Sequence, residues 1–365
     1  MAIRVGISGM GRIGRLVLAA MIDDPDIEVV GLNDLTKLDA IAHLLKYDSV
    51  HGRLFRSVEK TEGGLTINDR FIPGLYERDI ARLDWNKVGA DLVIEASGKY
   101  TDATKARAHI DGGARKVLIT APAKNEDITI VMGVNDALYD PAQHHIVSNA
   151  SCTTNCLAPF AKVLLDTFGI RSGFMNTIHA YTGDQRLLDG SHKDLRRARS
   201  AALSIVPTTT GAAKAVALVL PALAGRLDGF ATRVPTPDGS LVDLTVELET
   251  PATIEEINAA MKAAAEGPMQ GILEYCTDPI VSADVIGNTH SSIFDAQLTM
   301  VLGDRNSGAG GSGGAGGAGS GAGGAGGAGA KSEAGRGYLA KCIAWYDNER
   351  GYAERVRDLA KRMLS

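Results

Sequence analysis

The chain has 365 residues, 45% of them hydrophobic, and its 38 basic and 43 acidic side chains give a formal net charge of −5. This composition excludes a disordered, collagenous or disulfide-stapled protein, and the length exceeds the ~250–300 residues at which a single hydrophobic core stops growing. A slightly acidic chain has no general attraction for phosphate backbones or anionic lipid, so we expect neither nucleic acid nor a membrane as a partner.

The N-terminal part alternates strands with helices. A β-type run over residues 2–8, a glycine-rich turn, a helical pattern over residues 15–22 and a second β-type run over residues 27–32 form one βαβ unit. Two further buried strands and an intervening helix are predicted at residues 92–96, 117–120 and 101–109. This order predicts a parallel sheet covered on both faces, in an α/β domain that ends near residue 150.

The pattern changes after residue 150. A helix is predicted at residues 152–168, and another at residues 254–266, which begins after Thr253 and ends at Gly267. Longer strands are predicted at residues 232–234, 241–249 and 291–301. Fewer crossovers and longer strands favour a mixed or antiparallel sheet in a second, α+β domain. The charged amphipathic helix predicted at residues 354–363 must pack against a partner surface to be stable.

Residues 306–337 differ from the rest of the chain because they contain 16 of its 43 glycines. With almost no side chain to bury, this segment cannot offset its ordering entropy, so we predict a flexible insertion. It separates apolar runs at residues 298–302 and 342–345, which are typical of consecutive strands. The predicted position is a hairpin tip, where loop-closure entropy grows only slowly with length.

Cysteine content and the N-terminal residues indicate the compartment. Four cysteines are too sparse for a disulfide framework, and none lies in a Cys-x-x-Cys pair. Residues 2–8 lack the basic region and cleavage site of a secretory signal. No run reaches the ~18–20 apolar residues of a membrane span. We expect a cytoplasmic protein with reduced thiols.

The first motif with chemical meaning is the glycine-rich turn. Gly9, Gly11 and Gly14 form a G-x-G-x-x-G pattern between strand and helix, and Asp34 follows twenty residues after the last glycine. Such glycines often only let a strand and a helix pack closely. In this context, however, bare backbone can approach a pyrophosphate while the acid binds the ribose. We predict a dinucleotide site, and because Asp34 would repel a 2′-phosphate, NAD is favoured over NADP.

A second motif places Cys152 in the first turn of a predicted helix. There the helix dipole and free backbone N–H groups favour a thiolate. A small buried hydrophobic residue is the commoner fate of cysteine, and position alone does not decide between the two. Cys156, one turn later, is expected to be inert. His179, where an apolar run meets a polar loop, is a candidate base for Cys152 among the eight histidines.

A third set combines hydroxyl and basic side chains that suit a phosphate ester. Its members are Thr182, Arg196, Arg197, Arg199, Thr208, Thr209, Thr210, Gly211 and Arg233. Each alone is usually a solvated residue or a helix cap. Arg233 fits that interpretation least, because it lies in a predicted buried strand, where an unpaired guanidinium is costly.

Six segments, in this order, together resemble one family: GMGRIGR, SNASCTTNCLAP, HAYTGDQ, PTTTGAAKA, RVPTPDGS and WYDNE. The chain resembles phosphorylating, NAD-dependent glyceraldehyde-3-phosphate dehydrogenases of type I along its whole length except residues 306–337. The resemblance implies that Cys152 attacks the aldehyde and His179 takes the thiol proton. It also implies glycolytic oxidation of D-glyceraldehyde 3-phosphate to 1,3-bisphosphoglycerate through a thioester, with NAD and inorganic phosphate.

The resemblance further implies the architecture and the remaining site residues. A Rossmann domain spans residues 1–150 and is completed by residues 348–365, a catalytic domain spans residues 151–347, and the enzyme is a homotetramer. The implied cofactor contacts are Arg12, Ile13, Asp34, Arg78, Thr120 and Asn348, the last at the carboxamide. The two implied phosphate sites comprise Ser151, Thr153, Thr182, Arg197, Thr210, Gly211 and Arg233. No metal site is implied.

Three alternatives stay open at this point. Erythrose-4-phosphate dehydrogenases share the nucleophile and cofactor motifs, although they lack the pattern at Thr182 and at Thr210 and Gly211. A secondary binding role for the glycine-rich segment is compatible with a complete catalytic set. Use of NADP is also open, because Ser191 is the residue type that NADP-using relatives place near the 2′-phosphate.

Overall fold

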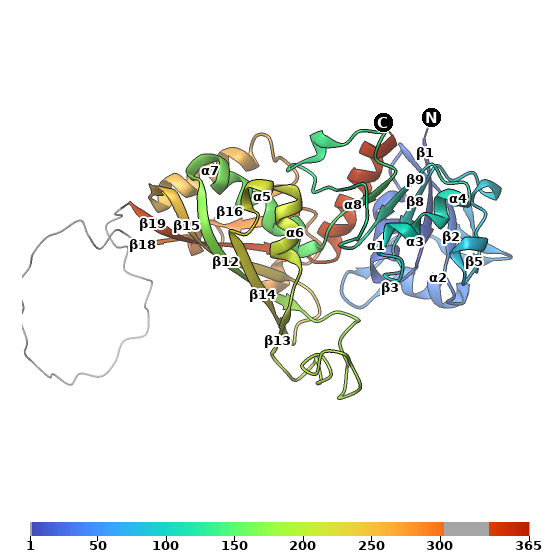
Figure 1. Cartoon of the computed structure of the whole chain (residues 1–365). Helices are drawn as coiled ribbons and strands as arrows, with labels where there is room; N and C mark the ends of the chain where they lie inside the picture. The colour runs from blue at the N-terminus through green and yellow to red at the C-terminus, as the bar shows by residue number, and fades with distance from the viewer. Residues whose placement is uncertain (1, 303–335, 365) are drawn as a thin grey trace, which may run out of the picture.

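The computed structural model describes residues 2–302 and 336–364. Two layered bodies lie side by side in Figure 1, and the last helix, α8 (Arg350–Leu364), stands between them. The first body holds the N-terminal strands and helices, and the second holds the elements from α5 to β19.

The first body is built on a six-stranded sheet, ordered β10-β11-β9-β8-β1-β2, in which every pair is parallel. Its strands are β1 (Ile3–Ser8), β2 (Ile27–Asn33), β8 (Leu92–Glu95), β9 (Lys116–Ile119), β10 (Ile128–Thr129) and β11 (Ile146–Ser148). Its helices are α1 (Arg12–Met21), α2 (Leu38–Lys46), α3 (Ala103–Ala106) and α4 (Ala108–Asp111), with 3-10 turns η1 (Ile80–Arg82), η2 (Trp85–Lys87) and η3 (Asp136–Leu138). Two small antiparallel sheets join β3 (Tyr47–Asp48) to β4 (Gly52–Arg53), and β5 (Val58–Thr61), β6 (Gly64–Ile67) and β7 (Arg70–Pro73) to one another. The predicted parallel α/β sheet is confirmed.

The second body contains an eight-stranded mixed sheet, ordered β13-β14-β12-β15-β19-β17-β16, with β18 paired to β19. Its strands are β12 (Ile170–Ala180), β13 (Val206–Thr209), β14 (Leu227–Val234), β15 (Ser240–Ala252), β16 (Leu273–Cys276), β17 (Ser292–Asp295), β18 (Met300–Leu302) and β19 (Gly337–Tyr346). Its helices are α5 (Cys152–Phe168), α6 (Ala212–Val219) and α7 (Ile254–Ala265), with 3-10 turns η4 (Pro221–Leu223), η5 (Ser282–Val285) and η6 (Ala296–Leu298). The β12–β14 and β16–β17 pairs are parallel and the other pairs are antiparallel, which confirms the predicted mixed sheet.

Each body has its own hydrophobic core. In the first, Ile7 of β1 and Leu18 of α1 share one buried cluster with Val356 and Leu359 of α8. In the second, α5 supplies Phe160 and Leu164 to a cluster that includes residues of β15 and β19. The last helix therefore buries its apolar face against the first strands and helix of the chain.

Side-chain caps explain where several elements begin and end. Thr253 and Glu256 form a reciprocal capping box at the start of α7. Helix α8 begins at Arg350, earlier than predicted, because the Asp347 carboxylate accepts hydrogen bonds from the backbone N–H groups of Glu349 and Arg350.

Two sequence predictions of single elements were wrong. The helix predicted at residues 101–109 is two short helices, α3 and α4. The strand predicted at residues 291–301 is interrupted by η6, because the Asp295 side chain accepts a hydrogen bond from the backbone N–H of Gln297 and turns the chain.

The strands that flank the glycine-rich segment pair with each other, as the hairpin prediction requires. Met300 lies opposite Lys341 and Leu302 opposite Leu339, in an antiparallel arrangement. The segment itself, and with it the predicted flexibility of residues 306–337, lies almost wholly outside the described residues.

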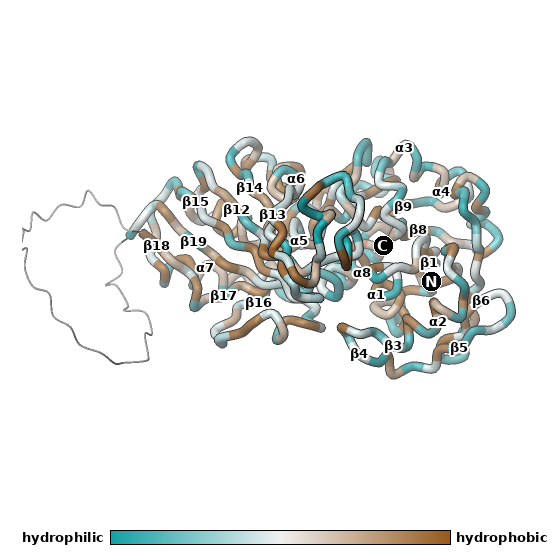
Figure 2. Tube along the Cα trace, turned by 90° about the horizontal axis from the view of Figure 1, so that it is seen from below, coloured by the Kyte–Doolittle hydropathy of each residue, from teal (hydrophilic) through white to brown (hydrophobic). Residues whose placement is uncertain are grey.

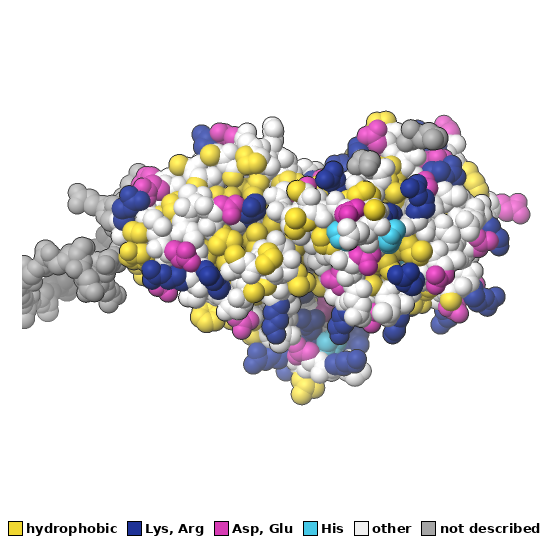
Figure 3. All heavy atoms as spheres, turned by 45° about the horizontal axis from the view of Figure 1, so that its top comes forward, with side chains coloured by type: hydrophobic (Ala, Val, Ile, Leu, Met, Phe, Trp, Pro, Cys, Tyr) yellow, Lys and Arg dark blue, Asp and Glu magenta, His cyan; other side chains and the backbone are white. Residues whose placement is uncertain are grey.

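Two surface features bear on partners. The connection between β12 and β13, in the foreground of Figure 2, exposes the large aliphatic side chains Leu187, Leu188, Leu195 and Leu203. On the face drawn in Figure 3, basic and acidic side chains are interspersed over most of the surface, and basic side chains gather on the projection at the bottom of the view. Within residues 2–302 and 336–364, no helix combines the length and the apolar character that crossing a membrane requires.

Candidate active site

A cavity of about 420 Å³ lies beside the glycine-rich turn and the N-terminus of α5. Ala96 and Ser97, which follow β8, and Tyr352 of α8 also contribute to its walls. Of the residues predicted from the sequence, ten line it: Gly11, Arg12, Ile13, Thr120, Ser151, Cys152, His179, Thr182, Arg233 and Asn348. The fold thus brings predicted cofactor and catalytic residues to one space.

Cys152 is presented by a tight turn between β11 and α5. Ala150 has a φ of 54°, a left-handed conformation that is unusual for a residue other than glycine. The Asn155 side chain holds this turn by donating to the backbone oxygens of Asn149 and Ser151, at 2.8 and 3.0 Å. Ser151 caps α5 by accepting from the Thr154 N–H at 3.0 Å. Cys152 is therefore the first residue of the helix, as predicted.

His179, at the end of β12, faces the thiol. Its Nε2 lies 3.5 Å from Cys152 Sγ, and its Nδ1 lies 2.7 Å from the carbonyl oxygen of Ala180. A carbonyl oxygen only accepts, and Arg233 Nη1, which lies 3.0 Å from Nδ1, has other acceptors in the Ala180 oxygen and Thr182 Oγ1, so we assign the proton to Nδ1. Nε2 then has a free lone pair directed at the thiol, which is the arrangement that a general base requires.

Burial keeps both members of this pair neutral. It raises the pKa of the Cys152 thiol to about 11, against the opposing effects of Arg233 and the Thr153 backbone. Burial and then the charge of Arg233 lower the pKa of His179 to about 3. Burial of the thiol thus opposes the effect of the helix N-terminus, which favours a thiolate. Burial also raises the pKa of Cys156, consistent with the predicted inert thiol.

The three glycines of the turn have different roles. Gly9 has a φ of 100°, and a Cβ there would collide with the backbone of Ser97. A Cβ on Gly14 would collide with the carbonyl oxygen of Gly9. A Cβ on Gly11 would meet nothing within 4 Å, so this residue leaves bare backbone at the cavity wall. The turn therefore fits a dinucleotide, with two glycines for packing and one for close approach.

Asp34 supports the same turn. Its carboxylate accepts from the backbone N–H groups of Met10 at 2.6 Å and Thr36 at 2.7 Å. Although burial acts in the opposite direction, these hydrogen bonds lower the pKa of Asp34, so the carboxylate is ionised at neutral pH. Arg78 does not line the cavity and is exposed, on a segment that Asn33 holds by two hydrogen bonds to the Glu77 backbone.

The predicted phosphate-binding residues separate into two groups. Arg233 lines the cavity and donates to Thr182 Oγ1 at 3.1 Å. Thr182 and Ser151 line it as well, whereas Thr153, Arg197, Thr210 and Gly211 do not. Arg197 is bonded to Thr208 and Asp184, Thr153 donates to or accepts from Tyr346, and Thr210 and Gly211 precede α6, where Thr210 accepts from the Ala212 N–H.

The sequence reasoning missed several residues that position this site. Glu349 accepts hydrogen bonds from Arg12 through both carboxylate oxygens. Ser240 accepts from the Ala180 N–H at 3.0 Å and donates to Asn348 Oδ1 at 2.6 Å, linking the end of β12 to Asn348. Both lie in quoted motifs, WYDNE and RVPTPDGS, but no local pattern shows that these motifs meet.

A parallel sheet with this glycine turn, beside a cavity that also holds a thiol–imidazole pair, is the arrangement of a dinucleotide-dependent oxidoreductase. Residues 3–103 match the family model for the NAD binding domain of glyceraldehyde 3-phosphate dehydrogenase, and residues 151–308 match the model for its C-terminal domain. The chain therefore belongs to the glyceraldehyde-3-phosphate dehydrogenase family, and NAD is its cofactor.

Similarity to individual proteins extends over the whole chain. It is 54% identical to glyceraldehyde-3-phosphate dehydrogenase of Geobacillus stearothermophilus, covering 100% of this chain and 99% of the relative. It is 52% identical to glyceraldehyde-3-phosphate dehydrogenase 1 of Bacillus subtilis, with 99% and 98% covered. Identity to the Streptomyces coelicolor enzyme of the same name is also 52%, with 98% of each covered.

Proposed function

We propose that this chain oxidises D-glyceraldehyde 3-phosphate to 1,3-bisphosphoglycerate in glycolysis, with Cys152 as nucleophile and His179 as base. The observation that supports this most directly is the 3.5 Å separation of Cys152 Sγ and His179 Nε2 in the cavity that also contains the glycine turn. An unprotonated Nε2 beside a neutral thiol allows proton transfer as the sulfur attacks.

Cys152 Sγ forms a bond to the aldehyde carbon while its proton passes to Nε2 of His179. The oxygen that develops negative charge is stabilised by the free backbone N–H at the start of α5 and by the protonated imidazole, which then transfers its proton to that oxygen. His179 next removes the same hydroxyl proton as the carbon is oxidised. When bound, NAD supplies the hydride acceptor for this step. Inorganic phosphate then displaces Cys152 from the thioester, and the sulfur regains a proton from His179.

The cofactor is held, in this proposal, by the first body and by Asn348. The backbone at Gly9, Gly11 and Gly14 admits the pyrophosphate, and Asp34 binds the ribose hydroxyls. Because Ser240 donates to Asn348 Oδ1, the amide nitrogen of Asn348 is available for the nicotinamide carboxamide. The remaining proposed contacts are Arg12, Ile13, Arg78 and Thr120.

Two phosphate groups require two cationic sites. Arg233 and Thr182, beside His179, form the site inside the cavity. Arg197, with Thr208 as its neighbour, belongs to the second, and a bound phosphate would compete with Asp184 for its guanidinium. The proposal assigns Ser151, Thr153, Thr210 and Gly211 to these sites as hydroxyl and backbone donors.

We also propose the domain limits and the assembly. The NAD-binding domain comprises residues 1–150 with 348–365, and the catalytic domain comprises residues 151–347. Four exposed leucines on the β12–β13 connection support burial against another subunit, and the assembly proposed is a homotetramer. The proposed location is the cytoplasm, without a nucleic acid partner.

Production of NADH from glyceraldehyde 3-phosphate, measured with and without inorganic phosphate, tests the proposal. We expect turnover that requires phosphate. Parallel reactions with erythrose 4-phosphate, and with NADP in place of NAD, should be at least tenfold less efficient in kcat/KM, a difference of about 1.4 kcal/mol. A higher kcat/KM for erythrose 4-phosphate would overturn the substrate assignment.

A further inference from the structure

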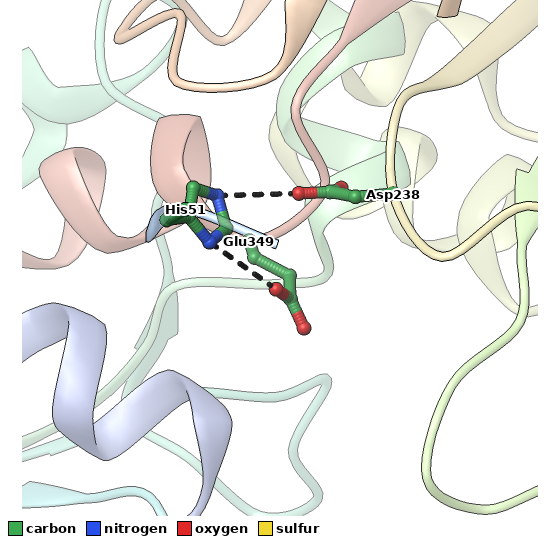
Figure 4. A group of neighbouring side chains, drawn as sticks. All are labelled: His51, Asp238 and Glu349. Carbon is green, nitrogen blue, oxygen red and sulfur yellow. Dashed lines mark ion pairs between the residues drawn. The ribbon is translucent and has the colours of Figure 1, made fainter. Parts of the chain in front are cut away.

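His51 lies outside the catalytic pair, in a cluster of four carboxylates. Its Nε2 is 3.0 Å from Asp347 Oδ2 and 3.2 Å from Asp238 Oδ2. Its Nδ1 is 3.7 Å from Asp48 Oδ1 and 3.8 Å from Glu349 Oε2. Figure 4 shows the ring between Asp238 and Glu349, with one nitrogen directed at each. These side chains come from three separate parts of the chain.

Four carboxylates of this cluster face two cations, Arg12 and His51, if His51 is an imidazolium, and Arg12 alone if it is neutral. The Asp238 and Asp347 side chains are fully buried. Arg12 is already bonded to Glu349 and Asp48, which leaves His51 to face the two buried aspartates. Arg15 and Arg350 line the small cavity next to His51, but Arg350 pairs with Glu354 and Arg15 donates to the Met10 carbonyl. A neutral ring would leave buried carboxylates without compensation.

Two members of the cluster, Asp347 and Glu349, flank Asn348 in the sequence. Asp347 uses Oδ1 to accept the backbone N–H groups of Glu349 and Arg350, and Oδ2 to accept the Gly287 N–H at 2.7 Å. Asp238 belongs to the same turn as Ser240, which donates to Asn348 Oδ1. His51 therefore contacts both segments that fix the side chain and the backbone of Asn348.

We propose that protonated His51 is a positioning residue for the cofactor site, which holds Asn348 in place by binding Asp347 and Asp238 at the same time. The inference rests on the proposed role of Asn348 as a cofactor contact. His51 belongs to the first body and holds two loops of the second body. The first body thus contributes this residue to the cofactor site in addition to its glycine turn.

The same atoms raise the question of a cation site. One ligand atom each from His51, Asp238 and Glu349 lie within 4.8 Å of one another, a spacing that a divalent cation can use. However, both Glu349 oxygens accept from Arg12, and a protonated His51 Nε2 can donate to Asp347 Oδ2 while it pairs by charge with Asp238 Oδ2, which has no hydrogen-bond partner among the described residues. The geometry favours the proton.

The neighbouring charges determine the pH range of this arrangement. Although burial opposes it, hydrogen bonds to Asp238 and Asp347 raise the pKa of His51 to about 10. Burial, followed by the charges of Asp347 and Glu349, raises the pKa of Asp238 to about 6. His51 thus stays charged through neutral pH and loses its proton only as the pH rises through about 10. NAD affinity should fall on that alkaline side.

The test is direct NAD binding to the intact protein without substrate, by calorimetry, for H51Q, D238N and the double variant H51Q/D238N. H51Q should raise the Kd for NAD at least tenfold while changing kcat at saturating NAD less than threefold. D238N should change Kd less than threefold. The double variant should bind NAD more tightly than H51Q, because it removes one of the two aspartate charges that H51Q leaves uncompensated. His43→Gln, exposed on α2, is the matched control and should have no effect.

The proposal would be overturned if the Kd of H51Q for NAD equalled that of wild type at every pH between 6 and 10. It would also be overturned if the double variant bound NAD no more tightly than H51Q. Stoichiometric binding of Zn²⁺ or Mg²⁺ alone that both H51Q and D238N abolish would overturn it as well. If H51Q does not fold, D238N decides, because removing one acid lowers the pKa of His51 and must move the alkaline loss of NAD binding to lower pH. The calorimetric measurement of NAD binding needs no turnover. A protein that binds NAD but is inactive would therefore contradict the proposed reaction and not the proposed role of His51.

Discussion

The two histidines near Asn348 have opposite electrostatic environments. His179 faces a thiol and lies 3.0 Å from the guanidinium of Arg233, and its pKa is lowered to about 3. His51 faces four carboxylates, and its pKa is raised to about 10. Burial disfavours the charged form in both cases. At His179 the charge of Arg233 adds to the effect of burial, whereas at His51 the carboxylates outweigh it, so one imidazole is suited to act as a base and the other as a fixed cation.

The largest expected effect comes from removing the thiol whose proton passes to His179. Cys152→Ser should lower kcat at least ~10³-fold, because a hydroxyl is a far weaker nucleophile beside the same imidazole. NADH production measures it, and Cys276→Ser, outside the cavity, is the control. Peptide mapping after partial alkylation should find Cys152 modified in step with lost activity, and prior modification of Cys342 would show that the assignment is wrong.

Removing the charge beside His179 should make it more like an ordinary histidine. Arg233→Gln removes one cause of the lowered pKa, so the pKa of His179 rises. Because the base must be neutral, kcat/KM, which is lost as the pH falls through that pKa, should begin to fall at a higher pH than in wild type.

The same substitution affects the thiol in a second measurement. Arg233 lowers the pKa of Cys152, so its removal raises that pKa and should slow alkylation at pH 8, because less of the thiol is ionised. Arg56→Gln, an exposed arginine paired with Asp23, is the matched control. Identical pH profiles for Arg233→Gln and wild type would mean that burial alone sets both pKa values.

Asp34 differs from the carboxylates around His51 because it is expected to contact the cofactor itself. A substitution at Asp34 tests this role. Asp34→Ala removes the ionised acceptor at the ribose and should raise the Kd for NAD about tenfold, or roughly 1.4 kcal/mol. The Kd for NADP should fall in the same variant, since a repelling charge is gone. Asp39→Ala, exposed on α2, is the control, and an unchanged NADP-to-NAD ratio in Asp34→Ala would contradict the assignment.

The smallest effect is expected from a deletion between β18 and β19, at the end of the second body that lies far from both histidines. Deleting residues 306–335 and joining β18 to β19 by a short turn should leave kcat within about threefold, because closure entropy changes slowly with loop length. Steady-state kinetics and a sizing column measure the outcome. A folded deletion variant of normal assembly without turnover would show that the segment takes part in catalysis.

Much of the molecule could be predicted from local sequence patterns. The bounds of α5, the position of Cys152 in its first turn, the glycine turn between β1 and α1, and the capped start of α7 depend on residues within one or two helical turns of each other. Their geometry follows from hydrogen bonds and sterics that act at short range. The pairing of β18 with β19 was predicted in another way, from the two apolar runs on either side of the glycine-rich segment.

The tertiary structure alone decided which distant residues act together and in which charge state. No pattern near His179 distinguished it strongly from the other histidines, and no pattern placed His51 beside Asp238 and Asp347, almost two hundred and three hundred residues away. A pKa depends on burial and on charges within a few ångströms, which only the folded chain specifies. The residue order determined the reactive groups, and their packing determined which of them are bases, cations or neutral thiols.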